Sequence, residues 1–187
     1  MFNALWPACV LGAANNMIWP GLILVFSLSV WQLSPPFKHI GDLRLALTCC
    51  LVGMCLDTTW LQLGWLDYAT NVPSNGVAPI WIAFLWIGFG FSINHSMSWL
   101  LRFPRFGPLF IGLTAPITYL TAERLGAVQW AESKVLIYSC IGLSWGLFLY
   151  GLLFLAKYWR EGSSSINFKM WRVGLWIVLI LLSRGIY

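Results

Sequence analysis

Long apolar runs, separated by short polar segments, make up most of this chain. The run at 79–101 holds 23 residues without a single Asp, Glu, Lys or Arg. An apolar helix of that length crosses a lipid bilayer. We therefore predict an all-α protein, a polytopic transmembrane helical bundle with about six to seven membrane segments. After residue 33, the predicted segments lie at 44–66, 79–101, 106–122, 134–156 and 170–182.

The first apolar stretch, 3–33, leaves two arrangements open. As one helix it would be about 45 Å long, against a hydrocarbon core of about 30 Å. Residues 12–21 are the natural place for a break, because Pro20 lacks a backbone donor and glycines stand at both ends. The side-chain amides of Asn15 and Asn16 can satisfy backbone groups at such a break. The pattern favours a hairpin of two short helices over one long tilted span.

The composition agrees with a membrane location. Of the 187 residues, 59% are apolar and 9% are charged, and the mean hydropathy is +0.77. Soluble domains carry about 25% charged residues. We predict a single integral membrane domain over 1–187, without a soluble domain and in contact with membrane lipids. The net charge of +5 comes from basic residues spread over short loops, which is no pattern for binding nucleic acid.

These basic residues also predict the orientation of the chain. Alternate loops carry eight Lys and Arg residues on one side of the predicted bundle and three on the other. The positive-inside rule places the loops of Lys38, Arg102 and Lys157 in the cytoplasm. The eight are Lys38, Arg44, Arg102, Arg105, Lys157, Arg160, Lys169 and Arg172, and the three are Arg124, Lys134 and Arg184.

His95 is the first candidate for chemistry. It lies in the triplet Asn94-His95-Ser96, in the cytoplasmic half of 79–101. A polar cluster at that depth must face protein, a cavity or a bound molecule. One hypothesis gives His95 and Asn94 interhelical hydrogen bonds, and the other makes His95 a general base or a proton relay. Ligation of a metal or haem is disfavoured, because no second histidine lies within a predicted span.

Asp57 is the second candidate, as the only acid well inside an apolar run. An ionised carboxylate there needs a partner, and the candidates are Arg124, Thr58, Thr59 or a cation in transit. A functional role and a structural role at the helix end are equally supported. The catalytic candidates are thus His95 and Asp57, and the substrate-binding candidates are Asn94, Ser96, Asn16, Glu123 and Arg124.

Neither a metal site nor a cofactor is predicted. The five cysteines lie inside apolar runs, without CxxC or Cys-His spacing. The chain also has no HExxH or Walker motif.

Three strings carry a resemblance to a known family. They are Pro79-Ile-Trp-Ile with Leu85-Trp86, then Asn94-His-Ser-x-x-Trp99-Leu100, and Ala115-Pro-Ile-Thr-Tyr119 leading to Arg124-Leu-Gly-Ala-Val128. Together they resemble a family of small bacterial multi-pass inner-membrane proteins whose domain has no assigned function. The similarity is densest over 79–128, and the family usually has Gly where Ala115 stands. The resemblance implies a bacterial inner membrane and no particular activity.

Two functional hypotheses from different classes remain open. In the first, the protein binds or modifies a lipid or isoprenoid-like substrate in an intramembrane cavity around Asn94-His95-Ser96. In the second, it is a non-catalytic small carrier, or an accessory subunit that packs against other membrane subunits.

Overall fold

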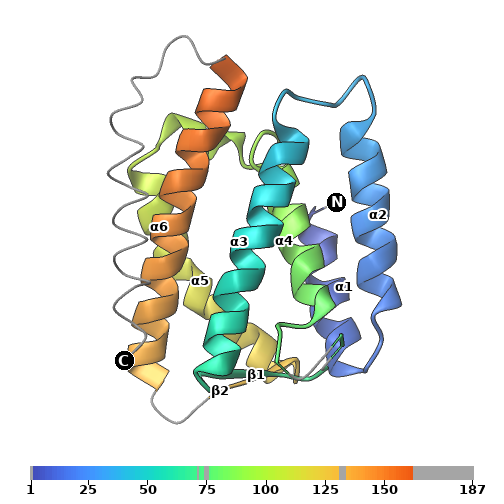
Figure 1. The fold of residues 1–187 in the computed structure, drawn as a ribbon, viewed down its shortest axis with the longest axis vertical. Coiled ribbons are helices and arrows are strands. Elements are labelled where there is room, and N and C mark those ends of the chain that lie inside the picture. The colour runs from blue at the N-terminus through green and yellow to red at the C-terminus, as the bar shows by residue number, and fades with distance from the viewer. Residues whose placement is uncertain (1, 71, 74–75, 131–133, 162–187) are drawn as a thin grey trace.

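The computed structural model describes residues 2–70, 72–73, 76–130 and 134–161, and the regular secondary structure of this part of the chain is helical apart from two short strands. Helices α2, α3, α4 and α6 run roughly along the long axis of the molecule, and α5 crosses behind them at a slant (Figure 1). Their bounds are α1 Phe2–Ala14, α2 Trp19–Leu33, α3 Asp42–Gln62, α4 Ile80–Ser92, α5 Phe106–Arg124 and α6 Lys134–Glu161, with a 3-10 turn η1 at Ser98–Arg102 and strands β1 Leu66–Tyr68 and β2 Val128–Trp130.

The first apolar stretch forms two helices, so the predicted hairpin is confirmed. The chain turns between α1 and α2, where Asn16 adopts a left-handed backbone conformation with φ 55°. The backbone N–H of Met17 donates to the carbonyl oxygen of Gly12 at 2.7 Å, and Asn15 Nδ2 donates to the carbonyl oxygen of Leu11 at 2.8 Å. These bonds satisfy carbonyls that the end of α1 leaves free.

The run at 79–101 does not form one helix, and this prediction was wrong. The α-helix within it, α4, has 13 residues and is about 20 Å long, too short for the hydrocarbon core. Below Ser92 the chain turns instead, because the N–H groups of His95 and Met97 both donate to the Ser92 carbonyl, at 3.1 and 2.9 Å. The run is apolar because α4 is surrounded by protein: it packs against α1, α2 and α3.

A two-stranded ribbon joins two segments that the sequence pattern leaves as loops. β1 pairs antiparallel with β2, with Leu66 opposite Trp130 and Tyr68 opposite Val128. The predicted topology places both of these loops on the same side of the membrane, and their pairing agrees with that placement. The ribbon holds the end of α3 beside the end of α5 (Figure 1).

Glycines set how closely the helices approach one another. A Cβ atom on Gly90 of α4 would lie 2.6 Å from the Cα of Ala46 on α3. At the crossing of α5 and α6, a Cβ on Gly142 would lie 2.6 Å from the carbonyl oxygen of Gly112. A Cβ on Gly53 would lie 2.0 Å from the indole of Trp86, so that ring rests directly on the backbone of α3. Small residues at these three positions make the close contacts possible.

Two described helices, α3 and α6, are long and apolar enough to cross a membrane. Three shorter apolar helices, α1, α2 and α4, accompany them. The predicted segment 106–122 corresponds to α5, and 134–156 to the first part of α6. The predicted segment 170–182 lies outside the described residues. The total of six to seven membrane segments stays a prediction.

The contact of Trp86 with Gly53 yields a stability prediction. Gly53→Ala forces the indole away from α3, and we expect it to lower the free energy of unfolding by about 1–3 kcal/mol. Unfolding of the purified protein in detergent, followed by circular dichroism, measures this. Gly151→Ala on α6 is the matched control, because a Cβ there meets nothing within 4 Å. It should leave stability unchanged or raise it by up to about 1 kcal/mol. Equal stabilities for the two variants would contradict the prediction.

Candidate functional site

Asp57 lies at the centre of a buried hydrogen-bond network. Its side chain is 0% exposed. Asp57 Oδ1 accepts hydrogen bonds from the Tyr68 and Tyr119 hydroxyls at 2.6 and 2.9 Å, and Asp57 Oδ2 accepts one from Trp86 Nε1 at 2.7 Å. The three donors come from β1, α5 and α4. One carboxylate on α3 therefore links three other elements of the fold.

None of the predicted partners of Asp57 is among these donors. Thr59 donates to the Cys55 carbonyl of its own helix, Thr58 accepts a bond from the Ala78 N–H, and Arg124 is exposed. The three aromatic donors give the carboxylate the compensation that a buried charge requires. Burial, with the negative charge of Asp57, raises the pKa of the Tyr68 phenol well above its ordinary value of 10.0, so Tyr68 stays a donor at neutral pH.

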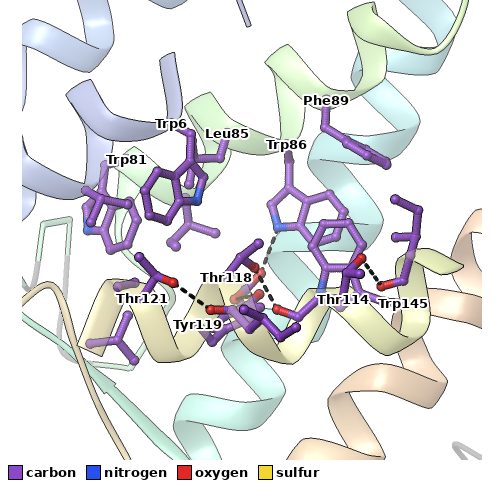
Figure 2. Close-up of a pocket in the computed structure, with 18 of the residues that line it drawn as sticks. Trp6, Trp81, Leu85, Trp86, Phe89, Thr114, Thr118, Tyr119, Thr121 and Trp145 are labelled. Atoms are coloured by element: carbon purple, nitrogen blue, oxygen red, sulfur yellow. Dashed lines mark hydrogen bonds between the residues drawn. The ribbon is translucent and has the colours of Figure 1, made fainter. Parts of the chain in front are cut away.

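A cavity of about 670 Å³ lies beside this network. Trp6, Trp81, Leu85 and Trp86 line one side of it, and Thr114, Thr118, Tyr119 and Thr121 line the other (Figure 2). The first group comes from α1 and α4 and the second from α5, so the cavity separates these helices. Trp145 of α6 closes one end, stacked on Trp86 with 4.4 Å between ring centroids.

The cavity wall is mostly apolar, with a few polar groups. The hydroxyls of Thr114, Thr118 and Thr121 donate to carbonyls of their own helix, which leaves their oxygens able to accept a bond. Trp81 is buried, and its Nε1 has no acceptor among the residues that the structure describes. Thr118, Thr121 and Ile117 line the cavity and are exposed, so it opens along α5.

The structure places His95 and Asn94 in a second network, around Asp42. Asn94 Nδ2 donates to Asp42 Oδ1 at 2.8 Å, and His95 Nε2 lies 3.0 Å from Asp42 Oδ2. Asp42 is 1% exposed. The hypothesis that His95 and Asn94 make interhelical bonds is thus supported by their contact with α3. The sequence did not single out Asp42 as a site residue, because it lies among exposed loop residues. The signal that could have identified it is its position in the first turn of α3, directly before an apolar run.

The remaining candidates do not gather around one site. Ser96, Asn16 and Arg124 are exposed, and Glu123 is half-buried. The cavity lining includes Asp57 but not the predicted triplet Asn94-His95-Ser96. The predicted cavity around that triplet therefore does not coincide with the cavity described above. The two catalytic candidates also belong to separate networks, Asp57 with its aromatic donors and His95 with Asp42.

Comparison with known proteins agrees with the resemblance noted in the sequence. Residues 1–151 match the family described as "Protein of unknown function (DUF2878)". The chain belongs to this family. The matched region contains the Asp57 network, the cavity and the Asp42 network, so all three lie within the family domain. No curated protein and no solved structure matches the chain.

Removing one donor from Asp57 tests the network. Tyr119→Phe leaves Asp57 Oδ1 with a single hydroxyl, and we expect it to lower the free energy of unfolding by about 1–3 kcal/mol. Tyr150→Phe makes the same chemical change at a residue that is 58% exposed, and should change stability by no more than about 0.5 kcal/mol. Denaturant unfolding in detergent measures both. A loss for Tyr119→Phe no larger than that for Tyr150→Phe would contradict the assigned role.

Proposed function

We propose that this protein is a multi-pass protein of the bacterial inner membrane that binds a lipid or isoprenoid-like molecule in the cavity between α1, α4 and α5. The observation that carries the proposal is the cavity of about 670 Å³ with an apolar wall and a few polar groups. Ligand pockets measure about 300–1,000 Å³ and have this kind of lining.

Apolar stripes on the outside of the helices support the membrane location. Large apolar side chains recur at helical spacing on the exposed faces of four helices. In water such faces would be unfavourable, whereas hydrocarbon solvates them. The stripes are Leu22, Phe26 and Val30 on α2; Leu43, Leu47 and Leu51 on α3; Phe110, Leu113 and Ile117 on α5; and Leu136, Leu143 and Leu147 on α6.

The ends of the bundle support the predicted orientation. The α2–α3 connection, the α4–α5 connection and the end of α6 lie at one end, and the two strands lie at the other (Figure 1). Lys38, Arg102 and Lys157, which the positive-inside rule places in the cytoplasm, all belong to the first end. The proposed topology therefore has the strand ribbon on the outer face.

Labelling of introduced cysteines tests this topology. Lys38→Cys and Gly76→Cys add thiols at two exposed positions near opposite ends of the bundle. In intact cells a membrane-impermeant maleimide should label Gly76→Cys and leave Lys38→Cys unlabelled until the cells are opened. The unmodified chain controls for its five native cysteines. Labelling of Lys38→Cys in intact cells would overturn the orientation.

The direction of the cavity opening indicates the source of the ligand. The opening lies along α5, beside the apolar stripe that we assign to the lipid phase. A molecule dissolved in the bilayer can enter from there without crossing water. Trp81 Nε1 then supplies a donor for an oxygen on the ligand. Asp57 accepts three hydrogen bonds from the surrounding protein, so its role in the proposal is to hold the cavity wall and not to react.

Filling the cavity tests the binding proposal. Thr118→Phe places a ring in the opening, and Leu113→Phe makes a comparable change on the outer stripe of α5, at a residue that is 69% exposed. We expect the wild type and Leu113→Phe to copurify with a lipid that is enriched over its share of the membrane. Thr118→Phe should lose at least about nine tenths of this enriched lipid, because the introduced phenyl ring occupies the ligand's place. Mass spectrometry of extracts from equal amounts of protein measures this.

Thermal unfolding of the three proteins serves as the folding control. The proposal fails if the wild type carries lipids only in the proportions of the bulk membrane. It fails equally if folded Thr118→Phe retains as much of the enriched lipid as Leu113→Phe.

A further inference from the structure

A compact cluster of metal-ligating side chains lies at the end of the bundle away from the strands. It consists of His39 from the α2–α3 connection, Asp42 from the first turn of α3, and His95 from the segment after α4. One ligand atom from each lies within 4.8 Å of the others. The two imidazole rings meet edge to face, with 4.6 Å between their centroids. His39 and His95 are the only histidines in the sequence.

The hydrogen bonds around His39 prepare one nitrogen for coordination. His39 Nδ1 lies 3.1 Å from the carbonyl oxygen of Phe37. A carbonyl can only accept, so Nδ1 carries the proton and Nε2 keeps its lone pair. Metal-binding histidines commonly have their second nitrogen bonded to a backbone carbonyl in this way. His39 is therefore held in the tautomer that a metal ligand needs.

Asp42 and His95 have the spacing of two ligands of one ion. His95 Nε2 lies 3.0 Å from Asp42 Oδ2. Two atoms at about 2.0–2.1 Å from a tetrahedral zinc ion are about 3.3 Å apart. Asp42 is held in place by the backbone N–H of His39, which donates to Oδ2 at 2.8 Å, and by Asn94. Small shifts of the side chains would admit an ion between the three residues.

Asn94 supplies an independent indication of a ligand. The residue is 5% exposed, and while its Nδ2 bonds Asp42, its Oδ1 has no partner within the described part of the chain. A buried carbonyl oxygen without a donor is unfavourable. Water bound to an ion at the neighbouring cluster would provide that donor. Because His39 is exposed and the His95 side chain is 18% exposed, an ion can enter from the aqueous side.

We propose that His39, Asp42 and His95 bind one divalent transition-metal ion of the zinc class, with a water molecule at the open position and Asn94 Oδ1 as that water's acceptor. Two imidazoles and one carboxylate are a ligand set typical of such ions. On binding, His95 takes the neutral tautomer with its one proton on Nδ1, any second proton passing to solvent, so that Nε2 and Asp42 turn their lone pairs to the ion. The site joins α3, the α2–α3 connection and the segment after α4.

Zinc titration of the full chain tests the proposal. The protein is purified in detergent with a tag that contains no histidine, stripped with a chelator, and titrated with Zn²⁺ against a chromophoric competitor. We expect one ion per chain. His39→Ala removes one ligand from an exposed position and should weaken binding by about 100-fold or more. Lys38→Ala changes the adjacent exposed residue and should bind as the wild type does.

Two further measurements identify the ligands. Zn²⁺ should raise the melting temperature of the wild type and of Lys38→Ala but not of His39→Ala. Co²⁺ in place of Zn²⁺ should give visible absorption bands without a sulfur-to-cobalt charge-transfer band, because no cysteine belongs to the cluster. A wild type that binds no Zn²⁺, equal binding by His39→Ala, or a sulfur-to-cobalt band would overturn the proposal and leave His95 and Asp42 as an ion pair between two parts of the fold.

Discussion

The structure depends most on the buried carboxylate of Asp57. A charge at 0% exposure is unfavourable unless its lone pairs are satisfied, and here Tyr68, Tyr119 and Trp86 satisfy them. Each donor belongs to a different element, so the positions of β1, α4 and α5 are all fixed relative to α3 by one group. Loss of any donor would leave part of a buried charge without compensation. This makes the arrangement of these elements specific in a way that apolar contacts alone do not.

A second buried acid works with Asp57 to set the register of α4 on α3. Asp57 pairs with Trp86, whereas Asp42, about 22 Å away along the helix, pairs with Asn94 after the end of α4. The later residue of α3 meets the earlier residue of α4, so the two helices run antiparallel. Gly90 lies against Ala46 between these two pairings. Polar bonds near both ends and a close glycine contact in the middle determine how α4 sits in the bundle.

The cavity follows from how α5 is attached. Tyr119 ties α5 to Asp57, β2 ties its end to β1, and α6 packs along it. The large rings of Trp6 and Trp86 and the short side chains of Thr118 and Thr121 then face one another across open space (Figure 2). The polar network that stabilises the fold is therefore also the wall that shapes the proposed binding site. The proposed metal site lies in the other network, so the two proposals stand on separate residues.

The sequence by itself determined the structural features that depend on residues close to one another along the chain. Apolar runs predicted α3, α6, the break between α1 and α2, and α5 almost to the residue. The resemblance to a family without an assigned function is confirmed. Only the tertiary structure decided where α4 ends, which strands pair, and what Asp57 and His95 contact. Those contacts join residues 62 and 53 positions apart, Tyr119 with Asp57 and His95 with Asp42. Local hydrophobic pattern records whether a side chain is buried, but a hydrogen-bond partner is chosen by how distant helices pack, and no local pattern encodes that.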